Sequence, residues 1–188
     1  MSQSRPRLSH RFMEEHNRYR VMHATAKGVA EKGYHATSVA HLVKAAGMAR
    51  NTFYETFSGK EEAFVATVEW TIQEALQRVQ EAAGAAPDGS TREQRSLAGL
   101  AALLEFIDQQ TDRARVCLIY APAAAPAAYE GMLESFAVLT GMGEPKAQLV
   151  VGGIVWMLYR DLVTPARNPD LPAEIQRWLE MQLTPVPA

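Results

Sequence analysis

Apolar residues recur at three- and four-residue steps along almost the whole chain, the period of an α-helix that buries one face. Runs that alternate apolar and polar residues between hairpin turns, the pattern of β-strands, are almost absent. The pattern predicts an all-α protein of about nine helices, with no internal repeat of solenoid length. The expected helices lie at about 21–32, 37–46, 49–57, 58–83, 90–107, 113–121, 129–139, 145–162 and 172–183.

Capping residues and helix breakers set the expected boundaries of these helices. Two segments, 58–61 and 90–93, have the capping-box spacing of a serine three residues before a glutamate. Gly47 ends one short helix, and the 87–89 segment of Pro, Asp and Gly separates two longer helices. Pro145 suits the first turn of the helix that follows it. An Ala- and Pro-rich connector is expected between the helices at 113–121 and 129–139.

The charge is unevenly divided, although the 188-residue chain carries a formal net charge of only −2. Residues 1–60 hold ten lysines and arginines against four acids, or +6, and the remaining 128 residues hold nine against seventeen, or −8. A basic end on an acidic body indicates that one part meets a polyanion and the other does something else. With 47% apolar and 21% charged residues, the composition excludes a disordered chain, collagen and a coiled-coil rod.

Cysteine and histidine usage argues against disulfides, metals and cofactors. Cys117 is the single cysteine, so the cytoplasm is the expected compartment, and a small core residue is favoured over a redox sensor. No two of the five histidines have the spacing of a zinc site, so we expect no metal and no cofactor. The N-terminus lacks a secretory signal, and the apolar runs are shorter than the ~20 residues of a membrane span, so a soluble protein is expected.

Segment 37–57 is typical of a helix-turn-helix, two short helices joined by a tight turn at Gly47. In its second helix Ala49, Phe53 and Phe57 form a stripe that we expect to be buried. The neighbouring stripe, with Arg50, Asn51 and Tyr54, could read base edges in the major groove. Hydrogen-bond donors around the starts of both helices could hold phosphates. The predicted DNA-binding residues are Thr37, Ser38, Arg50, Asn51, Thr52, Tyr54 and Lys60. The alternative is an ordinary helix pair whose basic face is merely solvated.

An ordered string of motifs in this region closely resembles the N-terminal domain of TetR/AcrR-type regulators, over about residues 18–68. It consists of Glu31-Lys32-Gly33-Tyr34, Thr37-Ser38-Val39, Ala45-Ala46-Gly47, Thr52-Phe53-Tyr54, Phe57 and Lys60-Glu61-Glu62. The resemblance implies a two-fold dimer that reads a near-palindromic operator and is released by a small ligand. One departure is Ala49, which stands where the family often has Ser or Thr, so a cap on the reading helix is lost, at a cost of about 0.5–2 kcal/mol.

We therefore expect a basic N-terminal arm (1–14), a helix-turn-helix DNA-binding domain (15–68) and a ligand-binding and dimerisation domain (69–188). No histidine follows His41, so the C-terminal part has no triad of the Ser-His-Asp type, and we expect no enzyme. Its rings suit either an apolar ligand cavity or an ordinary core. The residues assigned to the cavity are Trp70, Phe106, Tyr120, Tyr129, Phe136, Trp156 and Tyr159.

Two adjacent glycines inside an apolar helix indicate a close helix–helix approach, either between two subunits or within one chain. The predicted dimer interface comprises Gly152, Gly153, Ile154, Met157, Ile175 and Leu179. The sequence thus predicts a cytoplasmic homodimeric repressor whose partners are operator DNA and a small apolar ligand. The alternative is a small all-α ligand-binding protein or enzyme that reads no operator.

Overall fold

The computed structural model describes residues 6–183, and throughout this range all regular structure is helical. The elements are α1 (Pro6–Lys32), α2 (Val39–Ala46), α3 (Arg50–Thr56), α4 (Lys60–Gly84), α5 (Arg92–Gln109), α6 (Thr111–Arg115), the π-helix η1 (Val116–Tyr120), α7 (Ala121–Ala124), α8 (Pro126–Thr140), α9 (Lys146–Val163) and α10 (Leu171–Leu183). Because α6, η1 and α7 follow one another without a break, the described chain has nine helical rods. The all-α prediction is confirmed. Residues 1–5 of the expected arm lie outside the described range, and α1 begins at Pro6.

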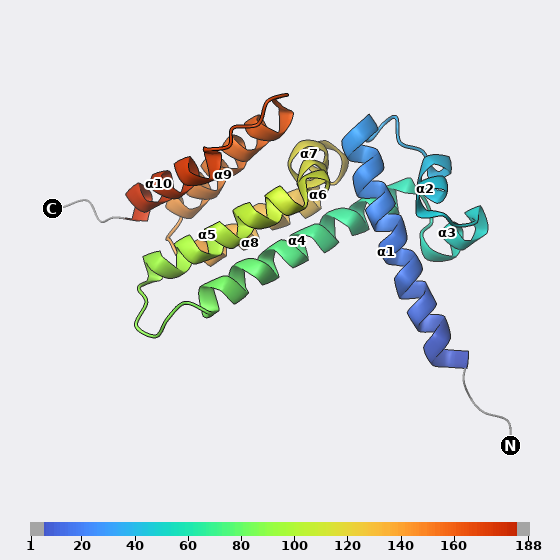
Figure 1. Ribbon diagram of the computed structural model, residues 1–188, viewed down its shortest axis with the longest axis horizontal. Helices are drawn as coiled ribbons and strands as arrows, with labels where there is room; N and C mark the ends of the chain where they lie inside the picture. The colour runs from blue at the N-terminus through green and yellow to red at the C-terminus, as the bar shows by residue number, and fades with distance from the viewer. Residues whose placement is uncertain (1–5, 184–188) are drawn as a thin grey trace, which may run out of the picture.

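The helices form a small N-terminal unit and a longer helical body, joined by α4 (Figure 1). Helices α1–α3 gather at one end, and α4 runs from them along the body beside α5. Gly99 of α5 lies against α4 so closely that an added Cβ would be 2.9 Å from Val79 Cγ1. The contiguous α6, η1 and α7 lie where α1 meets the body.

Helix α4 contributes to two separate hydrophobic cores. Its Ala63 is buried in the core of the N-terminal unit, together with residues of α1, α2 and α3. Its Phe64 and Val68 are buried in the larger core of the body. Since one rigid rod belongs to both cores, a displacement of α4 within the body must be felt by the N-terminal unit.

Three boundary predictions are wrong in detail. The Ser58 hydroxyl caps no helix amide: Ser58 N and Oγ both donate to Glu62, at 2.7 Å each, and the N-cap of α4 is Gly59. The second capping box is shifted by one residue, to Thr91 and Gln94. The expected Ala- and Pro-rich connector is almost wholly helical, because each of its prolines lies in the first turn of a helix, where no amide hydrogen is needed.

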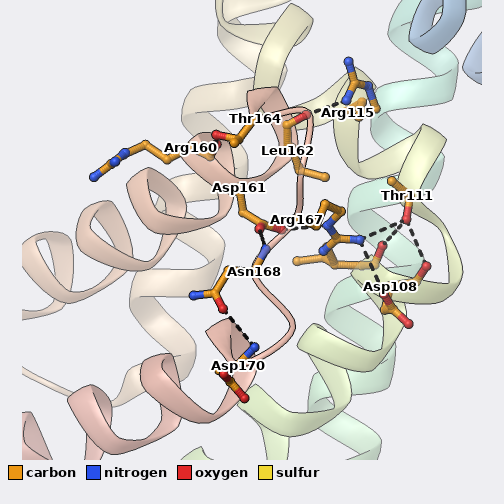
Figure 2. Close-up of polar contacts among 11 residues, drawn as sticks. Asp108, Thr111, Arg115, Arg160, Asp161, Leu162, Thr164, Arg167, Asn168 and Asp170 are labelled. Atoms are coloured by element: carbon orange, nitrogen blue, oxygen red, sulfur yellow. Dashed lines mark hydrogen bonds and ion pairs between the residues drawn. The ribbon is translucent and has the colours of Figure 1, made fainter.

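A buried carboxylate holds the connection between α9 and α10 (Figure 2). Asp161, whose side chain is 4% exposed, accepts hydrogen bonds from Arg167 Nε and from the backbone amide of Asn168, both at 2.7 Å. Arg167 also reaches Asp108 of α5, with 3.4 Å between Nη1 and Oδ1. These contacts tie the last helix to the body.

We expect Asp161→Ala to lower the free energy of unfolding by about 1.5–3 kcal/mol, because it removes two short hydrogen bonds to a buried charged group. Asp108→Ala is the matched control, since Asp108 pairs with the same arginine but its side chain is 79% exposed. It should cost at most about 1 kcal/mol. Urea unfolding of both variants measures the difference. Equal losses of unfolding free energy would show that the buried carboxylate of Asp161 contributes no more to stability than the exposed one of Asp108.

Candidate functional site

Helices α2 and α3 form the predicted helix-turn-helix, and its turn is held from outside by α1. Gly47 has the left-handed φ of 61° that ends α2, and its amide bonds back to carbonyls of α2. Arg20 of α1 donates from Nη2 to the carbonyls of Ala46 and Gly47, the latter at 2.8 Å. An added Cβ at Gly47 would be 3.2 Å from this nitrogen, so the turn suits glycine both by conformation and by space.

Helix α3 is anchored by its two phenylalanines. Phe53 and the C-cap residue Phe57 are 0% and 1% exposed, and the guanidinium of Arg18 lies 4.8 Å from the Phe57 ring centroid. Ala49, expected to be buried with them, is exposed as the N-cap. It makes no side-chain cap, which confirms that the cap is lost here.

The opposite face of α3 exposes a contiguous polar group. Arg50, Asn51 and Tyr54 are all exposed, and Arg50 Nη2 donates to the Tyr54 hydroxyl at 3.3 Å. The guanidinium also lies 5.6 Å from the Tyr54 ring centroid. Thr52, in the same helix, is half-buried. A guanidinium and an amide on an exposed helix can each make paired hydrogen bonds to base edges.

The remaining predicted DNA-binding residues have local structural roles. Thr37 is 1% exposed and donates its hydroxyl to Gly33 O at 2.9 Å, so its side chain faces inward and cannot reach a phosphate. Ser38 is exposed and caps α2 in a reciprocal pair with His41. Lys60 Nζ donates to Tyr34 O at 2.9 Å and lies 4.2 Å from the Tyr34 ring centroid, which ties the start of α4 to the α1–α2 loop.

The sequence does not single out two arginines of α1 that position this unit. Arg18 and Arg20 both belong to the basic N-terminal end, but their spacing does not indicate that one packs on an aromatic ring and the other holds the helix-turn-helix turn. Arg18 contacts the Phe57 ring and Arg20 contacts the turn at Gly47. These partners are 26 or more positions away in sequence, so only the folded chain shows the contacts.

The body contains an apolar cavity of about 340 Å³ between α4, α5, α8 and α9. At one end it is lined by Thr71, Phe106 and Cys117, which are buried. At the other end Arg92 and Gly141, both exposed, lie where α5 begins and α8 ends. A mostly apolar cavity of this size between helices is typical of a small-molecule site.

Only two of the seven aromatic residues assigned to the cavity line it, Phe106 and Phe136. Trp70 packs against α1, with its ring 4.8 Å from that of His23. The Tyr120 ring lies 3.8 Å from the position of a Cβ on Gly33, also toward α1. Trp156 is 60% exposed and stacks on Tyr159 with 5.8 Å between ring centroids. Tyr129 packs on the main core, and its burial raises the pKa of its hydroxyl.

Comparison with known proteins identifies the N-terminal unit. Residues 21–67 match the model of the family described as bacterial regulatory proteins, tetR family. The N-terminal domain is of the TetR type. This match confirms the resemblance that the sequence motifs indicated, and it covers α2, α3 and the parts of α1 and α4 that enclose them.

Solved structures share the fold over nearly the whole chain. The fatty acid degradation regulator FadR from Bacillus halodurans has a TM-score of 0.75 at 16% identity, covering 89% of this chain and 96% of its own. A TerR/AcrR-family transcriptional regulator from Aquifex aeolicus VF5 has a TM-score of 0.65 at 20% identity, covering 88% and 98%. No curated protein matches the sequence. The TetR-type fold supports DNA-binding transcriptional regulation, and regulators of this family are generally non-enzymatic DNA-binding proteins that act as dimers.

Arg113 of α6 links the cavity to the TetR-type domain. It is 3% exposed and donates to Glu74 Oε2 at 2.7 Å and to Thr71 Oγ1 at 3.2 Å. Its guanidinium lies 3.6 Å from the Trp70 ring centroid, and that ring touches His23 of α1. Burial would raise the pKa of Glu74, but the hydrogen bonds and charges of Arg113 and Arg78 outweigh it and lower that pKa. Desolvation, and then the charge of Arg113, lower the pKa of His23.

The residues assigned to a dimer interface are divided between the inside and the outside of the body. Ile175 and Leu179 are 0% and 4% exposed in the chain's own core, so they present no outer surface. Gly153 lies against Trp178, where an added Cβ would be 3.0 Å away, so this close approach is within one chain. Gly152 is exposed, with no atom within 4 Å of an added Cβ. Ile154 and Met157 are half-buried, and Ile154 lines the cavity.

A different stripe of α9 faces outward. Leu149, Gly152, Trp156 and Val163 recur at helical spacing, and Leu149 and Trp156 are 71% and 60% exposed. Met181 of α10 is 65% exposed. Large apolar side chains gathered on one exposed helix face mark a candidate interaction surface. None of the helices in residues 6–183 has an apolar stretch that could span a bilayer, and no group of three His, Cys, Asp or Glu side chains in this range could hold a metal ion.

The Cys117 thiol should be unreactive in the folded protein. Burial raises its pKa to about 12, and a raised pKa keeps an acid in its protonated form, so at pH 8 almost no thiolate is present. We expect an Ellman-type reagent to label Cys117 at pH 8 only after denaturant is added. Rapid labelling of the folded protein would contradict the core role and revive the redox-sensor alternative.

Proposed function

We propose that this protein is a ligand-responsive, sequence-specific DNA-binding regulator, a repressor that a small apolar molecule releases from a near-palindromic operator. The observation that carries the proposal is the exposed group of Arg50, Asn51 and Tyr54 on a TetR-type helix whose other face is buried. The proposal extends to the expected division into a DNA-binding domain (15–68) and a ligand-binding and dimerisation domain (69–188), acting in the cytoplasm.

In this proposal α3 lies in the major groove. Arg50 reads guanine, Asn51 reads adenine, and the Tyr54 hydroxyl holds the guanidinium of Arg50 in place. Ser38 and Thr52 remain candidates for phosphate contacts, which set the register on the duplex. Thr37 and Lys60 support the domain from within, so their replacement would act on folding before it acts on DNA.

Release by a ligand is supported by the position of α4. The helix lines the cavity at one end and belongs to the core of the TetR-type domain at the other. A molecule that fits the cavity best when α4 is displaced would also move the reading helix. The size of the effect is set by the difference in the ligand's affinity for the two arrangements.

A homodimer would place two reading helices on successive half-sites. The outward stripe of α9, together with Met181 of α10, supports this assembly better than the buried pair Ile175 and Leu179. Light scattering should give about twice the 20.7 kDa chain mass. A monomer at micromolar concentration would overturn the dimer.

The test is fluorescence anisotropy with DNA from upstream of the protein's own gene, at two salt concentrations. Tight, sequence-selective binding that weakens steeply with salt supports the proposal. Binding that is weak and unselective would favour the alternative, a small all-α ligand-binding protein or enzyme in which the helix-turn-helix reads no operator.

A further inference from the structure

The exposed end of the cavity is crossed by two arginines. Arg92 and Arg95, both in the first turn of α5, line it together with Gln80 of α4 and Thr140 and Gly141 at the end of α8. The opposite, buried end is apolar, with Phe106, Ile107 and Leu118. The cavity is therefore apolar at one end and cationic at the other.

Arg92 lies directly over the end of α8. Its Nη1 donates to Gly141 O at 2.6 Å, and its Cζ is 3.1 Å from the position of a Cβ on Gly141. This contact joins positions 49 residues apart, so the guanidinium bridges α5 and α8 beside the opening. The backbone carbonyl takes one donor of a group that has five.

Arg95 bonds more weakly, again to main-chain carbonyls. Its Nε is 3.4 Å from Ser90 O, and its Nη1 is 3.5 Å from Ala83 O at the end of α4. Long bonds of this kind are easily exchanged for a shorter bond to an anion. Arg95 is half-buried, so an anion there would be partly shielded from water.

Neither guanidinium forms an ion pair within the described part of the chain, in contrast to Arg113 and Arg167. The nearest acid in sequence is Glu93, whose pKa is lowered first by a hydrogen bond with Thr91 and further by the charge of Arg92. Glu93 does not line the cavity. Two positive charges thus remain at the opening of an apolar space.

We propose that the cavity takes a single-chain amphiphile with an anionic head, with the head at Arg92 and Arg95 and the chain directed toward Phe106 and Cys117. The apolar walls supply affinity in proportion to the chain length they cover, and the two guanidiniums select a carboxylate or phosphate over a neutral or cationic head. This inference rests on the ligand-binding part of the proposed function and narrows it to a class of ligand.

The length of the cavity sets the scale of the chain. Thr71 and Ala83, at its two ends, are twelve residues apart on α4, a rise of about 18 Å. Medium and long alkyl chains therefore fit lengthwise, and a short one leaves the apolar end empty. Each added methylene that is buried should tighten binding roughly fourfold.

The test is calorimetric titration of the protein alone, without DNA, with decanoate, dodecanoate, dodecyl phosphate, 1-dodecanol and dodecylamine, each below its aggregation concentration. We expect dodecanoate or dodecyl phosphate to bind about 10- to 100-fold more tightly than the alcohol or the amine. Dodecanoate, with two more methylenes, should bind roughly 15-fold more tightly than decanoate. Arg92→Gln and Arg95→Gln should each weaken binding of the anion about tenfold and leave the alcohol unchanged. Arg177→Gln, an exposed arginine of α10 outside the cavity, is the matched control.

Equal binding of anion and alcohol, or a preference for anions that survives both arginine substitutions, would overturn the inference. No binding of any of these probes would overturn it too. Because no DNA is present, the result is independent of operator binding. If the protein binds dodecanoate through Arg92 and Arg95 but does not bind DNA selectively, this inference holds and the proposed function is wrong. If it binds an operator but not these anions, the DNA-binding part of the proposed function holds and this inference is wrong.

Discussion

Arg50→Ala should weaken operator binding by about 1–3 kcal/mol, roughly 5- to 150-fold, without unfolding the protein. The side chain is exposed, and the contact that the substitution removes is a hydrogen bond with another exposed residue, Tyr54. Stability should therefore change by no more than about 0.5 kcal/mol. Anisotropy titration of the wild type and the variant against the same operator measures the loss.

The salt dependence separates the two ways in which Arg50 could act. If it reads a base, Arg50→Ala relaxes specificity at one operator position and leaves the slope of log affinity against log salt nearly unchanged. If it holds a phosphate, the slope becomes shallower by about 0.9 and the loss is the same for every sequence. Tyr54→Phe is the matched control: it keeps the ring beneath the guanidinium but removes the hydroxyl, so it should give a fraction of the effect. Wild-type affinity in Arg50→Ala would contradict the role given to α3.

Arg113→Ala should lower the free energy of unfolding by about 3 kcal/mol, the largest effect expected of any charged residue described here. The guanidinium is buried, donates to Glu74, Thr71 and the Trp70 carbonyl, and lies against the Trp70 ring. Hydrogen bonds to charged groups contribute about 1.5–3 kcal/mol, and a desolvated cation–π contact about 2 kcal/mol. These terms are not additive, because they share one side chain.

Arg78→Ala provides the comparison, because Arg78 pairs with the same Glu74 at 3.1 Å but has a side chain that is 39% exposed. It should cost at most about 1 kcal/mol. A double-mutant cycle of Arg113→Ala with Glu74→Ala should give a coupling energy of 0.5–3 kcal/mol. If Arg78→Ala and Arg113→Ala lowered the free energy of unfolding equally, burial of the Arg113 guanidinium would make no extra contribution to stability.

The helix-turn-helix could be predicted from the sequence because its signals are local. Ser38 and Gly47 mark the two ends of a short helix, and Phe53 and Phe57 lie one turn apart. These marks can be read within one short segment, although Gly47 and Phe57 also contact Arg20 and Arg18 of α1 in the folded chain. Ala49 was predicted to be buried but is exposed. The periodic pattern does not show that Ala49 is the N-cap, which lies outside the helix whose face is buried.

The cavity and the outer surface could not be predicted in the same way, since they depend on contacts between distant helices. Trp70 and Tyr120 have the apolar character of cavity residues, but both turn toward α1. The two adjacent glycines of α9 point in different directions, Gly153 against Trp178 and Gly152 outward. Arginines at the end of an apolar cavity leave no periodic pattern at all, so Arg92 and Arg95 were not anticipated.

The π-helix η1 lies in the middle of the rod formed by α6, η1 and α7, where this rod packs against α1. A π-turn holds one residue more than an α-turn, so deleting one residue from Val116–Tyr120 would restore a regular α-helix. Because the π-turn already absorbs that residue, the chain after the deletion would keep nearly its present orientation relative to α6. Deleting a residue from the regular α-helix α6 would instead rotate everything after it by about 100°. After a deletion in α6, Tyr120 would leave Gly33, and η1 would meet α1 with a different face. Within the rod formed by α6, η1 and α7, the loss of one residue is therefore expected to disturb the packing on α1 least in η1 and most in the α-helical turn before it.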